Sequence, residues 1–390
     1  MNICMIGFHQ YPIPPLRGGS LAIVAYDLIT EFAKKGHYVS VLSLKDPLLP
    51  NYEEKQRIRY YRIRNPIYQG DNIFGQSFAC LNYSFFSSIK IDSVKRVDVI
   101  QCFDPLVLPF LKWFKYFKKK PTMLRFGMGF GLSNGWDLLK RPNWFFLKLA
   151  DRIVVPSQFL KRLIITNLGL SGEQISIIPN GVNLKRFNPK HRGDMVRRKF
   201  NLGDSPVILF VGRISPEKGL DLLLESMPII QNRVRDVKLL VAGSLTDGPY
   251  TEQLKSIISK LRLHNVIFTG GIDVIDELPK VYAACNVFCS PSVHGEAFGN
   301  VAVEAMASGK PVVVTRSGGF PEIVENGKVG TIITKMRKEE LAQAIIEILE
   351  SEILQKKMGT AARKRAEESF SWDSAANRYL KLYKEVIEKR

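Results

Sequence analysis

Glu296 and Glu304 stand eight residues apart in the segment PSVHGEAFGNVAVEAMASGK, residues 291–310, and two carboxylates at this spacing could serve one ligand. The apolar run NVFCSPS before them favours a buried strand, and residues 298–308 favour a short helix that Gly309 ends. Glu296 is then expected in the loop above the strand end, and Glu304 just over one turn into the helix.

The start of this expected helix favours an anionic group. Its first backbone amides have no intrahelical acceptor, and the aligned peptide dipoles make this end positive. One carboxylate at the mouth, one deeper and an anion cradle between them suit a nucleotide-sugar, which has hydroxyls at both ends and phosphate in the middle. Taken alone, the segment fits an ordinary strand–loop–helix unit with solvated glutamates equally well. The amides concerned belong to Phe298, Gly299, Asn300 and Val301.

Two further loops carry residues that suit phosphate. Arg213 and Lys218 lie in GRISPEKG, directly after the strand-like run PVILFVG, and two cations beside a helix start could clamp a diphosphate. A solvated basic loop is the alternative. Near the N-terminus, Gly18 and Gly19 follow the first strand and precede a helix, where glycines let the backbone approach a phosphate closely. A Gly-Gly turn alone is a weak signal.

The elements that must position these residues alternate between strands and helices along the whole chain. Its 390 residues predict two domains, joined at IPNGVNLKRFNPK, residues 178–190. Apolar runs such as NICMIG, HYVSVLSL, VKLLVAGS and PVVVTR are typical of parallel strands covered by helices on both faces. The predicted fold class is therefore α/β, with two Rossmann-like doubly wound domains that face a ligand cleft.

Composition narrows the class of partner. The net charge is +19, and residues 1–180 hold 24 Lys and Arg against 12 Asp and Glu, so nucleic acid, an anionic membrane or an anionic substrate could each fit. No RRM, zinc-ligand or helix-turn-helix pattern supports nucleic acid, and no GxGxxG follows either first strand to support NAD. The five cysteines show no CxxC spacing, which favours buried thiols in a cytoplasmic protein without a metal site.

Residues 106–121 mix aromatic and basic side chains. One interpretation is a basic amphipathic helix on an anionic membrane, which would place the protein peripherally at the inner face of the cell membrane. The other is a helix that packs its aromatic residues on the sheet and leaves its lysines in solvent. On a helix the aromatic face would hold Phe110, Trp113, Phe114 and Phe117, and the basic face Lys112, Lys115 and Lys119.

The motifs GRISPEKGLDLLLES, IPNGVNLKRF, SPSVHGEAFGNVAVEAMASGKPVVVTRSGGFPEIVENG and SFSWDSAANRYLKLY resemble those of the group 1 retaining glycosyltransferases (family four), which have the GT-B fold. The resemblance is dense from about residue 177 onward and thinner before it. It implies an acceptor-side domain of residues 1–180 that a returning helix, residues 372–390, completes. Residues 190–371 would form the domain that binds the nucleotide-sugar.

The resemblance also assigns roles to residues. It implies that Arg213 and Lys218 bind the diphosphate, that Glu296 lies near the donor sugar and the reaction centre, and that Glu304 binds the ribose. The amides after Glu296 would hold sugar and phosphate, and the loop of Gly18 and Gly19 would close on the phosphate. The expected reaction is a metal-independent, retaining transfer from a UDP- or GDP-sugar to a glycan or lipid-linked saccharide, without a cofactor.

One departure from the family pattern concerns the acceptor side. Members commonly carry a histidine after the strand that here reads PTMLRFGMG, but no histidine lies between His37 and His191. Gly127 or a neighbour takes that position, and Arg125, Asp104 or His9 could supply part of the role. An alternative is therefore a protein that binds nucleotide-sugar without transferase activity of its own.

Overall fold

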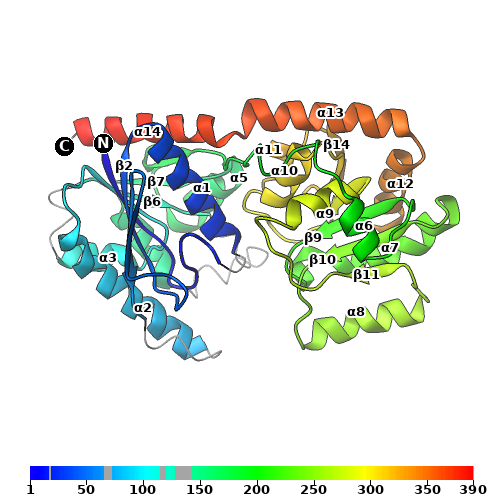
Figure 1. Cartoon of the computed structure of the whole chain (residues 1–390), viewed down its shortest axis with the longest axis horizontal. Helices are drawn as coiled ribbons and strands as arrows, with labels where there is room; N and C mark the ends of the chain where they lie inside the picture. The colour runs from blue at the N-terminus through cyan, green and yellow to red at the C-terminus, as the bar shows by residue number, and fades with distance from the viewer. Residues whose placement is uncertain (17–18, 66–72, 115–119, 128–141, 390) are drawn as a thin grey trace. The chain divides into compact units, whose positions relative to one another are not determined.

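The computed structural model describes residues 1–390 except 17–18, 66–72, 115–119, 128–141 and 390, and for 73–77 and 142–144 it describes the backbone alone (Figure 1). The described residues form two compact units, divided between Gly181 and Val182 and again between Ser371 and Trp372. Unit 1 thus contains the N-terminal part of the chain and its last helix, and unit 2 is the segment between them.

Unit 1 is built on one eight-stranded sheet. Its strand order is β3-β4-β2-β1-β5-β6-β7-β8, and all neighbours are parallel except β3 and β4. Ile6, near the end of β1, pairs with Leu42 on one side and Cys102 on the other, so the strand order reverses around β1 and β5. The strands are β1 (Asn2–Ile6), β2 (Tyr38–Leu44), β3 (Tyr52–Lys55), β4 (Ile58–Ile63), β5 (Val99–Cys102), β6 (Thr122–Arg125), β7 (Arg152–Val155) and β8 (Ile175–Ile177).

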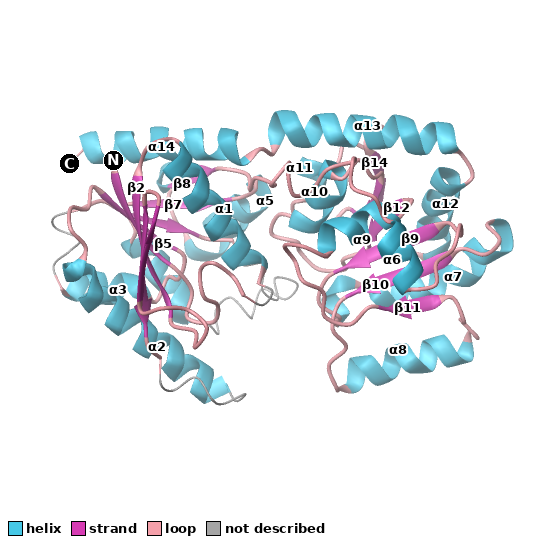
Figure 2. Ribbon diagram, viewed as in Figure 1, coloured by secondary structure: helices cyan, strands magenta, loops and turns pink. Residues whose placement is uncertain are grey.

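Helices cover both faces of this sheet (Figure 2). On one face α1 and α14 share a buried cluster with Met5 and Val41, in which the Phe32 ring lies 5.7 Å from the ring of Tyr383. On the other face α2 contacts the strands, and the Tyr83 hydroxyl donates to the Leu42 carbonyl at 3.0 Å. The helical segments are α1 (Ser20–Lys34), α2 (Ile73–Lys90), α3 (Val107–Trp113), α5 (Gln158–Leu168), α14 (Trp372–Glu388) and the 3-10 segments η1 (Ile91–Ser93), η3 (Pro142–Leu149) and η4 (Gly172–Gln174).

Unit 2 contains an all-parallel sheet of six strands in the order β11-β10-β9-β12-β13-β14. Its order reverses between β9 and β12, which is the place where open α/β sheets bind ligands. The strands are β9 (Val207–Val211), β10 (Lys238–Ala242), β11 (Val266–Phe268), β12 (Val287–Ser290), β13 (Val312–Thr315) and β14 (Gly330–Ile333). The helical segments are α6 (Asp194–Lys199), η5 (Pro216–Lys218), α7 (Leu220–Arg233), α8 (Pro249–Lys260), α9 (Leu278–Ala284), α10 (Asn300–Ala307), α11 (Phe320–Ile323), α12 (Lys338–Leu349) and α13 (Glu352–Ser369).

The prediction of two doubly wound α/β units is confirmed. Strand residues such as Leu209, Leu240, Val313 and Val314 are fully buried, as expected where helices cover both faces of a parallel sheet. All five cysteines are free and buried, and burial raises the pKa of Cys285 to about 11. These thiols are therefore part of the core and not nucleophiles.

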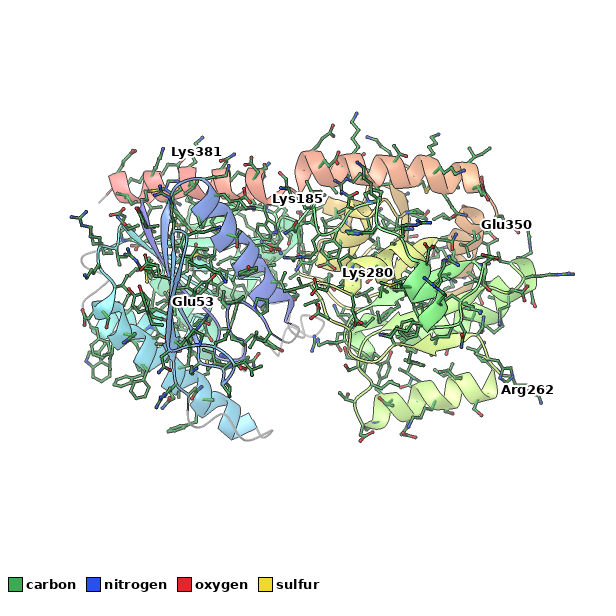
Figure 3. All side chains as sticks on the ribbon, viewed as in Figure 1. Glu53, Lys185, Arg262, Lys280, Glu350 and Lys381 are labelled. Carbon is green, nitrogen blue, oxygen red and sulfur yellow. The ribbon has the colours of Figure 1, made fainter. Side chains whose placement is uncertain are left out.

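Charged side chains are spread over both units. Among the described helices, none combines the length and apolar character that crossing a membrane requires. Figure 3 illustrates the dispersed charges with Glu53, Lys185, Arg262, Lys280, Glu350 and Lys381.

Candidate functional site

Three loops of unit 2 meet because β9, β12 and β13 are neighbours in the sheet. The Val293 amide donates to the Glu217 carbonyl at 3.0 Å, which joins the loop after β12 to the loop after β9. The Gly319 amide donates to the Glu296 carbonyl at 2.7 Å, which joins the loop after β13 to the loop after β12. The loops that hold the sequence-predicted residues are thus fixed to one another through their backbones.

Lys218 and Glu296 form the centre of this site. Lys218 Nζ lies 2.5 Å from Glu296 Oε2, with 22% and 18% of the two side chains exposed. The neighbouring Gly219 has φ +67, and a Cβ there would come within 2.2 Å of the Pro291 carbonyl oxygen. Only glycine therefore lets the Lys218 loop lie this close to the loop that carries Glu296.

Arg213 lies in the same loop as Lys218 but has a different partner. Its guanidinium is 3.2 Å from Glu217 Oε1, and 68% of its side chain is exposed. Burial raises the pKa of Glu217, but the adjacent Ser215 hydroxyl and the nearby Arg213 outweigh this and lower it overall. Glu217 is therefore a carboxylate that holds Arg213, and of these two cations it is Lys218 that pairs with Glu296.

A second glycine sets the backbone of Glu296. Gly318 has φ +59, and a Cβ there would overlap the Glu296 backbone, 2.0 Å from its oxygen. Gly299, the residue before α10, also has positive φ, and a Cβ there would meet the Phe320 ring at 2.5 Å. The segment from Glu296 to the start of α10 is consequently packed against the loop after β13.

Helix α10 begins at Asn300 and offers its positive end to this site. Gly299 supplies no side chain to cap the helix, and the positive end of a helix suits an anion. Phe298 is 4% exposed and packs on Phe370 with ring centroids 5.8 Å apart. Among the predicted donor-binding residues, Phe298 and Gly299 can thus act only through their backbones.

Glu304 lies one turn into α10, as predicted, and has a partner that sequence reasoning missed. The hydroxyl of Tyr282 on α9 lies 2.9 Å from Glu304 Oε2. Burial is the first cause that raises the pKa of Tyr282 well above its usual value, followed by the Glu304 charge. Tyr282 therefore remains a neutral donor that orients this carboxylate. No spacing in the sequence indicates the pair, because the two residues come from different helices.

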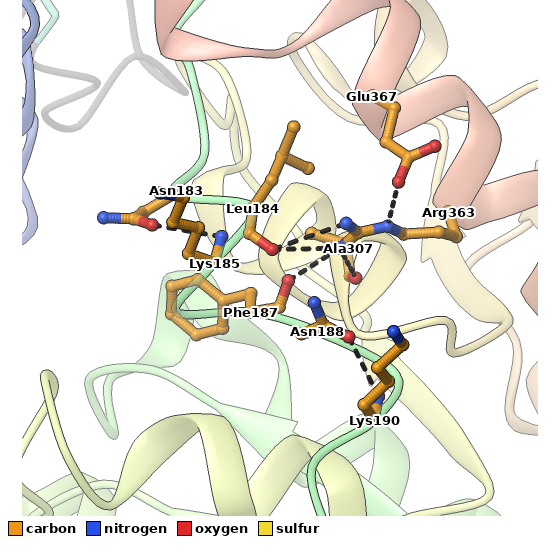
Figure 4. Close-up of polar contacts among 9 residues, drawn as sticks. All are labelled: Asn183, Leu184, Lys185, Phe187, Asn188, Lys190, Ala307, Arg363 and Glu367. Atoms are coloured by element: carbon orange, nitrogen blue, oxygen red, sulfur yellow. Dashed lines mark hydrogen bonds and ion pairs between the residues drawn. The ribbon is translucent and has the colours of Figure 1, made fainter.

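Arg363 on α13 fixes the other end of α10 (Figure 4). Its Nη1 donates to the carbonyls of Ala307 at 2.6 Å and Phe187 at 2.8 Å, and its Nε donates to Glu367 at 2.6 Å. A cation at a helix C-terminus is favourable because the last carbonyls there have no helical partner. The helix that carries Glu304 is thereby held at its C-terminal end.

Unit 1 holds a polar group at its own strand-order reversal. His9 follows β1 and Asp104 follows β5, and His9 Nδ1 lies 2.9 Å from Asp104 Oδ2, with 17% and 8% of the side chains exposed. The thiol of Cys80 on α2 donates to the same carboxylate oxygen at 3.2 Å. Burial raises the pKa of Asp104, but the His9 hydrogen bond and charge, together with the Leu106 amide and Cys80, lower it overall.

These three side chains place metal-ligand atoms within 4.8 Å of one another, although the sequence predicted no metal site. Burial, with the adjacent Asp104, raises the pKa of Cys80 far above its ordinary value. A protonated thiol that donates to a carboxylate is a poor metal ligand. The group is accounted for as a hydrogen-bonded network around Asp104.

Two further features of unit 1 that the sequence predicted are the loop of Gly18 and Gly19 and the side chain of Arg125. Gly18 lies outside the described residues, and Gly19 has φ +85 directly before α1, with Tyr11 packed against it. Arg125 is 2% exposed and bonds to Asn180 Oδ1. Its guanidinium occupies the place of a Cβ at Gly127, so a side chain there would have to displace it.

Comparisons with known proteins agree on one family. The model described as "Glycosyltransferase Family 4" matches residues 18–186, and "Glycosyl transferases group 1" matches residues 194–365. The GDP-mannose-dependent alpha-(1-6)-phosphatidylinositol monomannoside mannosyltransferase of Mycolicibacterium smegmatis is 32% identical over 264 residues, which are 65% of this chain and 68% of that protein.

Solved structures share the architecture of the whole chain. Sucrose-phosphate synthase from Thermosynechococcus elongatus has a TM-score of 0.83 at 23% identity, with 100% of both chains covered. Anabaena HepE in complex with UDP and glucose has a TM-score of 0.77 at 21% identity, covering 98% of this chain and 99% of that one. The fold is therefore GT-B, and the chain belongs to the group 1 glycosyltransferases.

Proposed function

We propose that this enzyme moves a sugar from a nucleoside-diphosphate sugar to an acceptor hydroxyl and retains the anomeric configuration. The observation that carries the proposal is the 2.5 Å pair of Lys218 and Glu296, located next to the start of α10. A cation, a carboxylate and a helix N-terminus in one place suit a diphosphate together with the sugar that it carries.

Donor binding would exchange ion pairs. A diphosphate offers Lys218 a stronger anion than Glu296 does, so Lys218 would turn to the phosphate and release Glu296 toward the sugar. Arg213 is largely exposed and would move from Glu217 to the same diphosphate. Glu304, held by Tyr282, would accept hydrogen bonds from the ribose hydroxyls.

In the transfer step, the bond between the anomeric carbon and the leaving phosphate oxygen breaks. The acceptor oxygen bonds to the same face of that carbon, and its proton passes to the departing phosphate. Lys218, Arg213 and the amides of Gly299, Asn300 and Val301 would stabilise the charge that grows on the diphosphate. These groups could do so without a metal or a cofactor.

On the acceptor side, we favour His9 among the three candidates that the sequence left open. Arg125 is engaged with Asn180, and Asp104 is buried beneath His9. His9 remains partly exposed at the carboxyl end of β1, where its Nε2 is directed by the bond that Nδ1 makes to Asp104. It would bind and orient the acceptor hydroxyl.

The finer identity of the substrates is also a proposal. One relative is named for GDP-mannose and a lipid acceptor, and one structural neighbour is a complex with UDP and glucose. Either a UDP- or a GDP-sugar would fit the features of unit 2. We favour a glycan or lipid-linked saccharide as acceptor, in cell-surface glycan or glycolipid synthesis at the inner membrane face.

A thermal-shift screen of the purified chain with UDP-, GDP-, ADP- and dTDP-sugars tests the donor site. A ligand that binds only the folded state adds RT ln(1 + [L]/Kd) to the free energy of unfolding and so raises Tm. We expect one nucleotide class to raise Tm in this way. Transfer with that donor should fall by about a hundredfold or more in Glu296→Ala. The control Glu339→Ala removes an exposed glutamate on α12 and should leave transfer unchanged. Transfer by Glu296→Ala at the wild-type rate would refute the site.

A further inference from the structure

Helix α2 carries its bulky apolar residues on the outside. Phe85 and Phe86 are 37% and 44% exposed, whereas Ser84, Ser87 and Ser88 are fully buried against the sheet. Exposed positions recur at helical spacing with Phe78, Leu81 and Ile89 among them. A helix that covers a sheet in water ordinarily shows the opposite arrangement, with its polar face outward.

Neighbouring elements extend this apolar surface. α3 contacts both α2 and η3, and the Phe85 ring lies 5.8 Å from Phe110 and 5.9 Å from Phe114. Trp113 at the end of α3 is 77% exposed, and Phe145 on η3 is 66% exposed. We call the following residues the aromatic face: Phe78, Leu81, Phe85, Phe86, Ile89, Trp113, Phe114 and Phe145.

Exposed large hydrophobic residues gather on the aromatic face. It contains eight of the fifteen large hydrophobic residues that are exposed in the described part of the chain. Single exposed apolar residues need no explanation, but a cluster of this kind marks a surface that binds something. In α3 the buried residues are the aliphatic Val107, Leu108 and Leu111, so Trp113 and Phe114 do not pack on the sheet as one sequence interpretation expected.

The three elements that carry the aromatic face have basic but no acidic side chains. The sequences of α2, α3 and η3 contain no Asp or Glu. Lys90, Lys112 and Lys148 are exposed, and Lys148 Nζ lies 5.5 Å above the Phe145 ring. Aromatic rings with lysines at their border match the chemistry of a bilayer surface, where rings enter the headgroup region and ammonium groups meet anionic lipids.

We propose that the aromatic face of α2, α3 and η3 docks on an anionic lipid bilayer. A second copy of the chain is a poorer occupant, because joining two such faces would bring like charges together. The inference deepens the proposed function, since a membrane-bound enzyme could reach a lipid-linked acceptor. Its test reads lipid binding and not transfer.

Co-sedimentation of the full chain with vesicles tests the docking. One set of vesicles is phosphatidylcholine, and the other is an equal mixture of phosphatidylcholine and phosphatidylglycerol. We expect wild-type protein to bind the mixed vesicles more strongly. The double variant Phe85→Ser/Phe86→Ser should lower its partition coefficient by at least about tenfold, because each phenyl ring would return to water. Lys90→Ser/Lys112→Ser should lower binding to the mixed vesicles by about fivefold per lysine and leave phosphatidylcholine binding unchanged.

Matched controls come from the same unit. Leu48 is 74% exposed and belongs to none of these three elements, and Lys381 is an exposed cation on α14. Leu48→Ser and Lys381→Ser should bind vesicles as the wild type does. All the substituted side chains are exposed, so the variants should fold, and their Tm should rise with the donor nucleotide as the wild type's does.

Three results would overturn the proposal: no binding of the wild type to mixed vesicles, binding that the phenylalanine variant does not weaken, or a wild-type dimer that this variant converts to monomer. Each of them would leave a donor-induced Tm shift untouched. Conversely, vesicle binding without any donor-induced Tm shift would contradict the proposed donor site and support the docking surface.

Discussion

At the scale of single residues, Lys218 is the cation most directly tied to the proposed chemistry. It is half-buried against Glu296, whereas Arg213 is exposed and paired with Glu217. We predict that Lys218→Met lowers kcat by about a hundred- to a thousandfold, because a preorganised donor to the leaving diphosphate is lost. Arg213→Met should cost less. Steady-state kinetics of both variants checks this, and a larger loss for Arg213→Met would show that the two roles are reversed.

Asp104 links the acceptor side to stability. Its pKa is lowered from an ordinary value of 3.8, so its ionised form stabilises the folded state above that pH, and the contribution is lost as pH falls through the lowered pKa. We expect Asp104→Asn to cost about 1–3 kcal/mol at pH 7, because a buried group loses its partners. Urea unfolding at pH 7 and again below 3.8 measures the difference, which should shrink at the lower pH. A constant difference would exclude ionisation as its source.

The sequence could predict these residues only where their spacing is local. Glu296, Glu304 and Lys218 lie in short motifs next to strands, and the structure places them in the loops and the helix that were expected. Tyr282 gave no such signal, and the glycine-rich turn that includes Gly318 did not show which backbone it approaches. Their roles arise because tertiary packing brings a phenol to Glu304 and a left-handed glycine under Glu296.

At the scale of elements, Gly219 decides how closely two loops approach. Gly219 and Gly203 have similar backbones, with φ +67 and +56, but only Gly219 has atoms where a Cβ would be, whereas nothing lies within 4 Å of that point at Gly203. We predict that Gly203→Ala costs about 1 kcal/mol of unfolding free energy from backbone strain alone.

Gly219→Ala should cost more than about 3 kcal/mol, since overpacking adds to the strain. Chemical denaturation of the two variants measures the gap between them. Equal losses of unfolding free energy would mean that the loop after β12 moves aside at little cost. The contact with Pro291 would then not hold the Lys218 loop in place.

Element type was readable from sequence, but the orientation of one helix was not. Strands such as Val312–Thr315 are β-branched and apolar on both faces, which parallel strands between helices require. In α2 the alternation of Phe and Ser shows an amphipathic helix without showing which face lies on the sheet. The small serines pack there, and the phenylalanines are left outside. The membrane interpretation of residues 106–121 therefore missed α2, and residues 115–119 lie outside the described part of the chain.

At the scale of the whole molecule, the last helix belongs to the first unit. α14 packs on α1 in a cluster that contains the buried side chains of Tyr379 and Tyr383. Sequence patterns alone show an amphipathic helix at this place, and only the family resemblance predicted that it returns to the first domain. Its partner α1 lies more than three hundred residues earlier, and no local pattern records such a contact.

This arrangement predicts unequal effects of truncation. Removing residues 372–390 takes eight buried side chains from the unit 1 core, Tyr379 and Tyr383 included. Each buried aromatic side chain is worth about 3–5 kcal/mol, and a domain has about 5–15 kcal/mol of stability, so unit 1 should unfold. Unit 2 keeps its six strands and all the proposed donor-site residues except Gly18 and Gly19, which belong to unit 1.

The truncated chain should therefore still bind the donor nucleotide by calorimetry, while limited proteolysis cuts within residues 1–181. Tyr383→Ala in the full chain is the milder control, with a loss of stability confined to unit 1. Loss of nucleotide binding in the truncated chain would mean that donor recognition depends on unit 1, and the assignment of the donor site to unit 2 alone would be wrong.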